Sequence, residues 1–147
     1  MVTTIKKLEE LITQLQKYVS ETSEAEISNK PNTEKWSKKE ILGHLVDSGI
    51  YNIQRFTEIQ FKEQSYRLQN YNQDELVKAN SYQNSSTNDI LDLLCALNKR
   101  IIELIKFQDH LTLKNEIILS SGEIINFKFL IEDYVIHFEH HTKQIVE

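Results

Sequence analysis

Apolar side chains recur at steps of three and four residues along much of the chain, which is the spacing of a helix with one buried face. The pattern predicts helices over residues 3–20, 38–62 and 87–107, and a fourth from residue 127 almost to the C-terminus. The clearest apolar series are Ile5, Leu8, Leu11, Ile12, Leu15 and Val19, and Ile90, Leu94, Leu97, Ile101 and Leu104. Four amphipathic helices of this length favour an all-α fold, an antiparallel four-helix bundle.

Polar residues mark where three of these helices begin. In the stretch SKKE, the Ser37 side chain can accept from the amide three residues on while Glu40 reaches back, which is a capping box. Ser86 or Thr87 can cap the third helix, and Asn126 can cap the fourth. We therefore expect the second helix to begin at residue 38 and the fourth at residue 127.

The connections differ in length and character. Residues 63–85 are rich in Asn, Gln, Ser and Tyr with little apolar period, so we expect a long connection with one short helix near Asp74 to Ala79. In LTLKNEIILSSGEIINF, two short apolar runs flank SSGE, which fits either a small hairpin or an extended loop before the last helix.

Length and composition favour one helical domain over residues 1–147. The chain has only three Gly and one Pro, too few for the glycine-dependent turns of nucleotide-binding loops and tight all-β folds. The net charge is −5 and no run of Lys and Arg is present, so we expect no nucleic acid partner. A small-molecule substrate is the expected partner instead.

The chain shows no membrane or disulfide signal. No run of about 20 apolar residues is present to span a bilayer, and the opening MVTTIKKLEELITQL mixes charged and apolar residues, so we expect a soluble, cytoplasmic protein. The single cysteine, Cys95, excludes an intramolecular disulfide and a thiolate cluster for zinc. Because it lies within a helical apolar pattern, we interpret it as a buried structural thiol.

The last predicted helix carries three histidines within five residues, in VIHFEHHTKQIVE. At about 100° per residue, His137 and His141 lie about 40° apart on the apolar side of the helix. His140 lies about 100° from His141, on a side that also carries Phe129 and Ile136. The geometry therefore predicts a pair, His137 and His141, and separates His140 from it as a packing or interface residue.

The second predicted helix supplies a third inward histidine. His44 begins a polar stripe, with Ser48, Tyr51 and Arg55, along one margin of an apolar face. Two imidazoles at i and i+4 can bind one Zn, Ni, Cu or Fe ion, and a third ligand from a neighbouring helix leaves positions open for substrate. A single inward histidine is more often a hydrogen-bonded core or surface residue, and His110, in the loop after the third helix, is interpreted in that way.

Three segments together resemble a known family. KWSKKEILGHLVDSGIYNIQRF is similar to the second-helix signature of the DinB-like superfamily, DYVIHFEHHTKQI resembles its closing helix, and NYNQDELVKANSY is similar to the intervening segment. The resemblance covers essentially the whole chain. It implies an up-down-down-up-like bundle, often dimeric, with a divalent metal held by three histidines, which by position are His44, His137 and His141. Relatives include thiol transferases dependent on bacillithiol, mycothiol or glutathione, a mycothiol-dependent isomerase, and proteins proposed as metal-dependent hydrolases.

Our working hypothesis is a metal-dependent S-transferase in which zinc or nickel, held by the three histidines, activates a low-molecular-weight thiol. In this hypothesis Arg55 binds a carboxylate of the thiol or substrate, and Tyr51 and Ser48 orient it. Asp133 and Gln144 could fix the tautomer of an imidazole by a hydrogen bond to the ring nitrogen that does not bind the metal. A surface salt bridge is an equally good explanation for Arg55 and for Asp133.

Two other hypotheses remain open. In the first, the protein is a hydrolase and metal-bound water is the nucleophile. In the second, it is a non-catalytic homodimeric bundle with a structural metal site, and the partly apolar side of the last helix packs against a second subunit.

Overall fold

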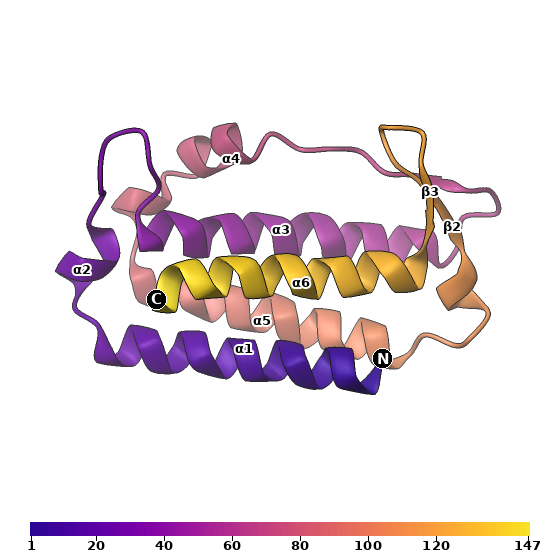
Figure 1. The fold of residues 1–147 in the computed structure, drawn as a ribbon, viewed down its shortest axis with the longest axis horizontal. Helices are drawn as coiled ribbons and strands as arrows, with labels where there is room; N and C mark the ends of the chain where they lie inside the picture. The colour runs from indigo at the N-terminus through magenta and orange to yellow at the C-terminus, as the bar shows by residue number, and fades with distance from the viewer.

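The computed structural model describes residues 1–147, and its four long helices form a bundle (Figure 1). These helices are α1 (Val2–Glu21), α3 (Lys38–Ile59), α5 (Thr87–Lys106) and α6 (Phe127–Val146). The predicted fold class is therefore confirmed. The helix bounds agree with the predicted ones within one residue except at the end of α3, which stops three residues earlier than expected.

The four helices do not simply alternate in direction. Figure 1 shows α1 and α6 running one way and α3 and α5 running the other way. Helix α3 packs against both α5 and α6, and α1 packs mainly against α6. Because α3 and α5 are parallel neighbours, the chain must return the length of the bundle between them. Residues 60–86 make this return, and we call them the crossover.

Short elements occupy the connections. They are α2 (Glu24–Ser28), β1 (Tyr66–Arg67), α4 (Gln73–Ala79), η1 (Tyr82–Asn84), η2 (Thr112–Lys114), β2 (Glu116–Ile118) and β3 (Ile124–Asn126). Strands β2 and β3 form an antiparallel hairpin, so of the two alternatives for SSGE the hairpin is correct. Strand β1 joins the hairpin in parallel, with Tyr66 opposite Ile117. Helix α4 is the predicted short helix, whereas α2, β1 and the two 3₁₀ turns were not predicted.

The predicted helix caps are present. The Ser37 hydroxyl accepts from the Glu40 amide at 3.1 Å, and the Glu40 carboxylate accepts from the Ser37 amide at 3.1 Å. Ser86, not Thr87, caps α5, and Asn126 caps α6. These local hydrogen bonds set the starting points of the helices that carry the candidate site.

Helix α3 is buried on every side near its start, since residues 41–49 are all buried. The crossover covers its outer face, and Gly43 makes this possible because a Cβ there would lie 2.2 Å from the Tyr82 ring. The Tyr82 hydroxyl donates to Asp47 at 2.6 Å, and the Asn80 amide donates to the same carboxylate at 2.9 Å. Burial raises the pKa of Asp47 above its usual range. The sequence predicted one buried apolar face and one exposed face for this helix. That pattern holds only for its later turns.

Other features of the chain agree with the expectations from sequence. Cys95 is buried, and burial raises the pKa of its thiol, as expected for a structural thiol. None of the helices combines the length and apolar character that crossing a membrane requires. On α6, Phe129 is 52% exposed and Ile136 is 64% exposed. The homodimer suggested for that side of α6 stays a prediction.

Candidate metal centre

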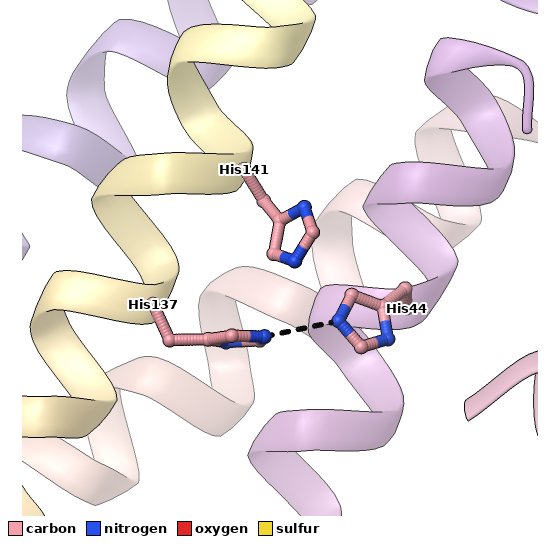
Figure 2. Close-up of side chains that lie close together, drawn as sticks. All are labelled: His44, His137 and His141. Carbon is pink, nitrogen blue, oxygen red and sulfur yellow. Dashed lines mark hydrogen bonds between the residues drawn. The ribbon is translucent and has the colours of Figure 1, made fainter. Parts of the chain in front are cut away.

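The antiparallel arrangement of α3 and α6 brings three histidines together. His44 lies near the start of α3, and His137 and His141 lie one turn apart near the end of α6, so the three rings meet between the two helices (Figure 2). One ligand atom from each ring lies within 4.8 Å of the others. The Nε2 atoms of His44 and His137 are 3.1 Å apart, and the His141 ring centroid is 4.6 Å from each of the other two centroids. The pair predicted on one helix and its predicted partner on another are thus neighbours in space.

Burial keeps these imidazoles neutral. Burial, together with the neighbouring His141 and His137, lowers the pKa of His44 to about 3. Burial is also the main reason that the pKa of His137 falls to about 4 and that the pKa of His141 is lowered. Neutral imidazole is the form that binds a metal ion through its free nitrogen.

The cluster suits a divalent ion. No carboxylate is hydrogen-bonded to the three rings, and the Nε2 atoms of His44 and His137 face each other at 3.1 Å, where both lone pairs can turn to one ion. The other ring nitrogen of His44, Nδ1, is buried without a hydrogen-bond partner. Because a Zn–N bond is about 2.0–2.1 Å long, three nitrogens this close can converge on one ion after shifts of less than about 1 Å. Three nitrogen ligands suit Zn, Ni, Cu and Fe rather than Mg or Ca.

Two further side chains hold the rings in place. The Nδ1 of His141 is 2.7 Å from Oε1 of Gln144, so this nitrogen carries the proton and donates, and the Nε2 lone pair is free. The Trp36 ring packs against His44 with centroids 5.0 Å apart. Sequence reasoning placed Gln144 near His137 and did not identify Trp36. Asp133, suggested for a similar role, is exposed and makes no hydrogen bond to any of the rings.

A depression opens beside the centre. Its volume is about 440 Å³, and its lining includes Trp36, Ile41, Gln73 and Gln144. None of the three histidines lines it, but Trp36 contacts His44 and Gln144 contacts His141, so one side chain separates the depression from each of these two rings.

The two remaining histidines lie outside the cluster. His140 is exposed, its ring packs against His141 with centroids 4.9 Å apart, and it is not one of the three clustered ligands. His110 is exposed in the loop after α5. The separation of His140 from the pair, argued from helical geometry, agrees with this arrangement.

The other candidate residues lie further along α3. Ser48 is buried, and its hydroxyl accepts from the Asn52 amide at 3.4 Å, so it faces a neighbour on its own helix. Tyr51 stacks on Tyr71 of the crossover, with ring centroids 4.5 Å apart. Arg55 lies against both tyrosine rings and donates to a backbone carbonyl of the crossover. Sequence reasoning missed Tyr71 because it lies in an irregular segment without periodicity.

Known proteins resemble the chain in sequence pattern and in fold. A family model described as the DinB superfamily matches residues 7–145. No curated protein matches the sequence. Among solved structures, one similar chain is YfiT from Bacillus subtilis, described as "a probable metal-dependent hydrolase with an unusual four-helix bundle topology", with a TM-score of 0.86 and 22% identity over 97% of this chain and 82% of that one.

A second similar structure is a mycothiol-dependent maleylpyruvate isomerase. Its TM-score is 0.76 at 10% identity, and the match covers 97% of this chain but only 59% of the isomerase. At these identities both likenesses establish the fold and leave the reaction open.

Proposed function

This chain is a member of the DinB superfamily, and from its three-histidine cluster we propose that it is a metal-dependent enzyme that transfers a low-molecular-weight thiol to an electrophile. The observation that carries the proposal is the convergence of His44, His137 and His141, three neutral imidazoles from two helices. His44, His137 and His141 would hold a divalent ion, with zinc or nickel expected. Such an ion lowers the pKa of a bound thiol, so that a thiolate is available at neutral pH.

The chain's own residues would prepare the site in three ways. Burial keeps the imidazoles unprotonated, so protons do not compete for the ligand nitrogens at neutral pH. Gln144 fixes the proton of His141 on Nδ1 and leaves Nε2 free. Trp36 covers one face of His44 and walls the depression, which limits access by water.

The proposed transfer is a substitution at carbon. The sulfur forms a bond to the electrophilic carbon as the bond from that carbon to its leaving group breaks. The leaving group departs with the electron pair, and the thiol proton passes to solvent. No oxidant or reductant is required.

A hydrolase is the second candidate, and the similarity in fold to a protein described as a probable metal-dependent hydrolase favours it. The same three histidines would then hold an ion that activates water instead of a thiol. The two functions differ in which molecule occupies the open side of the centre, so thiol binding discriminates between them.

Metal analysis tests the shared premise. We expect the purified protein to contain about one equivalent of ion, and His44→Ala, His137→Ala and His141→Ala each to lose it. His110→Ala is the matched control, because His110 is exposed and outside the cluster, and it should retain the ion. Retention of a full equivalent by any of the three site variants would contradict the assigned ligands.

Cobalt substitution then separates the two functions. A thiol that binds the ion should add a sulfur-to-cobalt absorption band to the spectrum of the cobalt-loaded protein, and turnover of an electrophile should require that thiol. If thiols leave the spectrum unchanged while ester or amide substrates are cleaved, the hydrolase replaces the transferase.

A further inference from the structure

Arg55 is a buried cation without an anionic partner. It is only 9% exposed, and all seven ion pairs in the structure are made by lysines. Its one hydrogen bond runs from Nη2 to the carbonyl oxygen of Gln69 in the crossover. A guanidinium has five N–H donors and stays protonated in proteins, and burying such a charge unpaired is costly. Arg55 therefore has unused N–H donors at a position where binding of an anion would be strongly favoured.

Two tyrosines hold the guanidinium without using its donors. The Arg55 Cζ lies 5.3 Å from the centroid of the Tyr71 ring and 5.9 Å from that of Tyr51. Contact with a ring face orients a guanidinium and leaves its N–H edge free for a planar anion such as a carboxylate. Both tyrosines are half-buried, so the group lies just below the surface.

The position is aligned with the histidine cluster. Along α3, Tyr51 is seven residues and Arg55 eleven residues after His44, and these steps return to within about 20° of the same side of the helix. The rise of the helix places Tyr51 about 10 Å and the Arg55 backbone about 16 Å from His44 along the axis, and the guanidinium lies beside the Tyr51 ring. A molecule that spans this distance along the same side of α3 would contact both groups.

We propose that Arg55 binds a carboxylate of the thiol, at about 10–16 Å from the sulfur that reaches the histidine centre. This assignment rests on the proposed thiol transferase function and narrows it to thiols that carry a distant carboxylate. Tyr51 and Tyr71 position the guanidinium, and a carboxylate accepts two parallel N–H bonds from its free edge. The competing explanation is that Arg55 only fastens the crossover to α3.

A pair of matched thiols tests the assignment. Mercaptooctanoate and mercaptooctanol have about the same length and differ only at the distant end, which is a carboxylate in the first and a hydroxymethyl group in the second, and mercaptopropionate is too short to reach Arg55. Binding is measured from the sulfur-to-cobalt band of the cobalt-loaded protein and from the fluorescence of Trp36, the only tryptophan, which contacts His44. We expect the long acid to bind about tenfold more tightly than the alcohol, as for a charge-assisted hydrogen bond, and the short acid to gain nothing.

Variants show whether Arg55 is responsible for the preference for the acid. In Arg55→Gln the preference for the acid should disappear while the affinity for the alcohol is unchanged. Arg67→Gln is the matched control, an exposed arginine on the same crossover, and it should keep the preference. If Arg55→Gln fails to fold, Arg55→Lys, which keeps the charge but lacks the planar fork, should reduce the preference.

The outcomes are distinct. Equal affinity for acid and alcohol in the unaltered protein overturns the assignment and leaves the thiol function intact. An acid preference that survives in Arg55→Gln also overturns it. If neither thiol changes the cobalt spectrum, the thiol function fails and the assignment fails with it.

Discussion

The contact between Gly43 and Tyr82 gives a prediction with an internal control. In Gly43→Ala the new Cβ would lie 2.2 Å from two atoms of the Tyr82 ring, so the ring must move. Helix α3 has a second buried glycine, Gly49, where a Cβ would meet its nearest neighbour, Leu97, at 3.5 Å, an ordinary van der Waals contact. The same substitution on one helix should therefore have opposite effects on stability.

The magnitudes follow from the two environments. Replacing Gly by Ala in a helix interior stabilises by up to about 1 kcal/mol, which is the whole effect expected for Gly49→Ala. In Gly43→Ala, overpacking costs about 1–3 kcal/mol. Displacing Tyr82 also breaks its 2.6 Å bond to buried Asp47, at a cost of about 1–3 kcal/mol. We expect a net loss of about 2–4 kcal/mol for Gly43→Ala.

Thermal unfolding in the presence of a chelator, followed by circular dichroism, measures both effects without a contribution from bound ion. Gly43→Ala should lower Tm by about 5–15 °C, and Gly49→Ala should raise it by up to about 4 °C. In a Tyr82→Ala background the clash is removed, so Gly43→Ala should become neutral or stabilising. If Gly43→Ala stabilises the otherwise unaltered protein as Gly49→Ala does, the packing of the crossover on α3 described above is incorrect.

Three further predictions concern the centre and the core. Gln144→Ala removes the acceptor for Nδ1 of His141 and should weaken metal binding by about tenfold in a competition titration, with unchanged stoichiometry. Because burial lowers the pKa of His44 to about 3, that of His137 to about 4 and that of His141 below its usual 6.5, protons compete for these nitrogens only below the pH at which an exposed imidazole takes up its proton. Metal affinity should therefore begin to fall only below pH 6.5, and a steep loss at pH 6.5 or above would contradict neutral ligands. Tyr134→Phe leaves the buried Oδ1 of Asn98 without its 2.7 Å donor and should cost about 1–3 kcal/mol in urea unfolding; no change would mean that another group satisfies this oxygen.

The long helices could be predicted because their signals are local. The three- and four-residue apolar period and the caps at Ser37 and Asn126 depend only on neighbours in the chain, and the helix bounds follow from them. Helical angles alone placed His137 and His141 on one side and His140 on another. The prediction that His44 lies close to this pair depended on the expected helix bundle, because no local pattern relates residues more than ninety positions apart.

The features that escaped prediction are those made by distant contacts. Strand β1 forms because Tyr66 pairs with Ile117 of the hairpin, and a two-residue strand has no period of its own. The crossover follows a path that no pattern in its sequence indicates, so neither the burial of α3 beneath Tyr82 nor the stacking of Tyr71 beside Arg55 could be anticipated. Helix α2 is five residues long, too short to show an amphipathic pattern.

The directions of the helices also decide where an affinity tag can be attached. Because α1 and α6 run in the same direction, residues 1 and 147 lie toward opposite ends of these helices, which are about 30 Å long (Figure 1). His141 is six residues before Glu147, so a polyhistidine tag joined there would hang beside the centre and supply competing imidazoles. A tag joined before Met1 would begin far from the three histidines. Metal stoichiometry should therefore be measured on protein tagged at that end or with the tag removed.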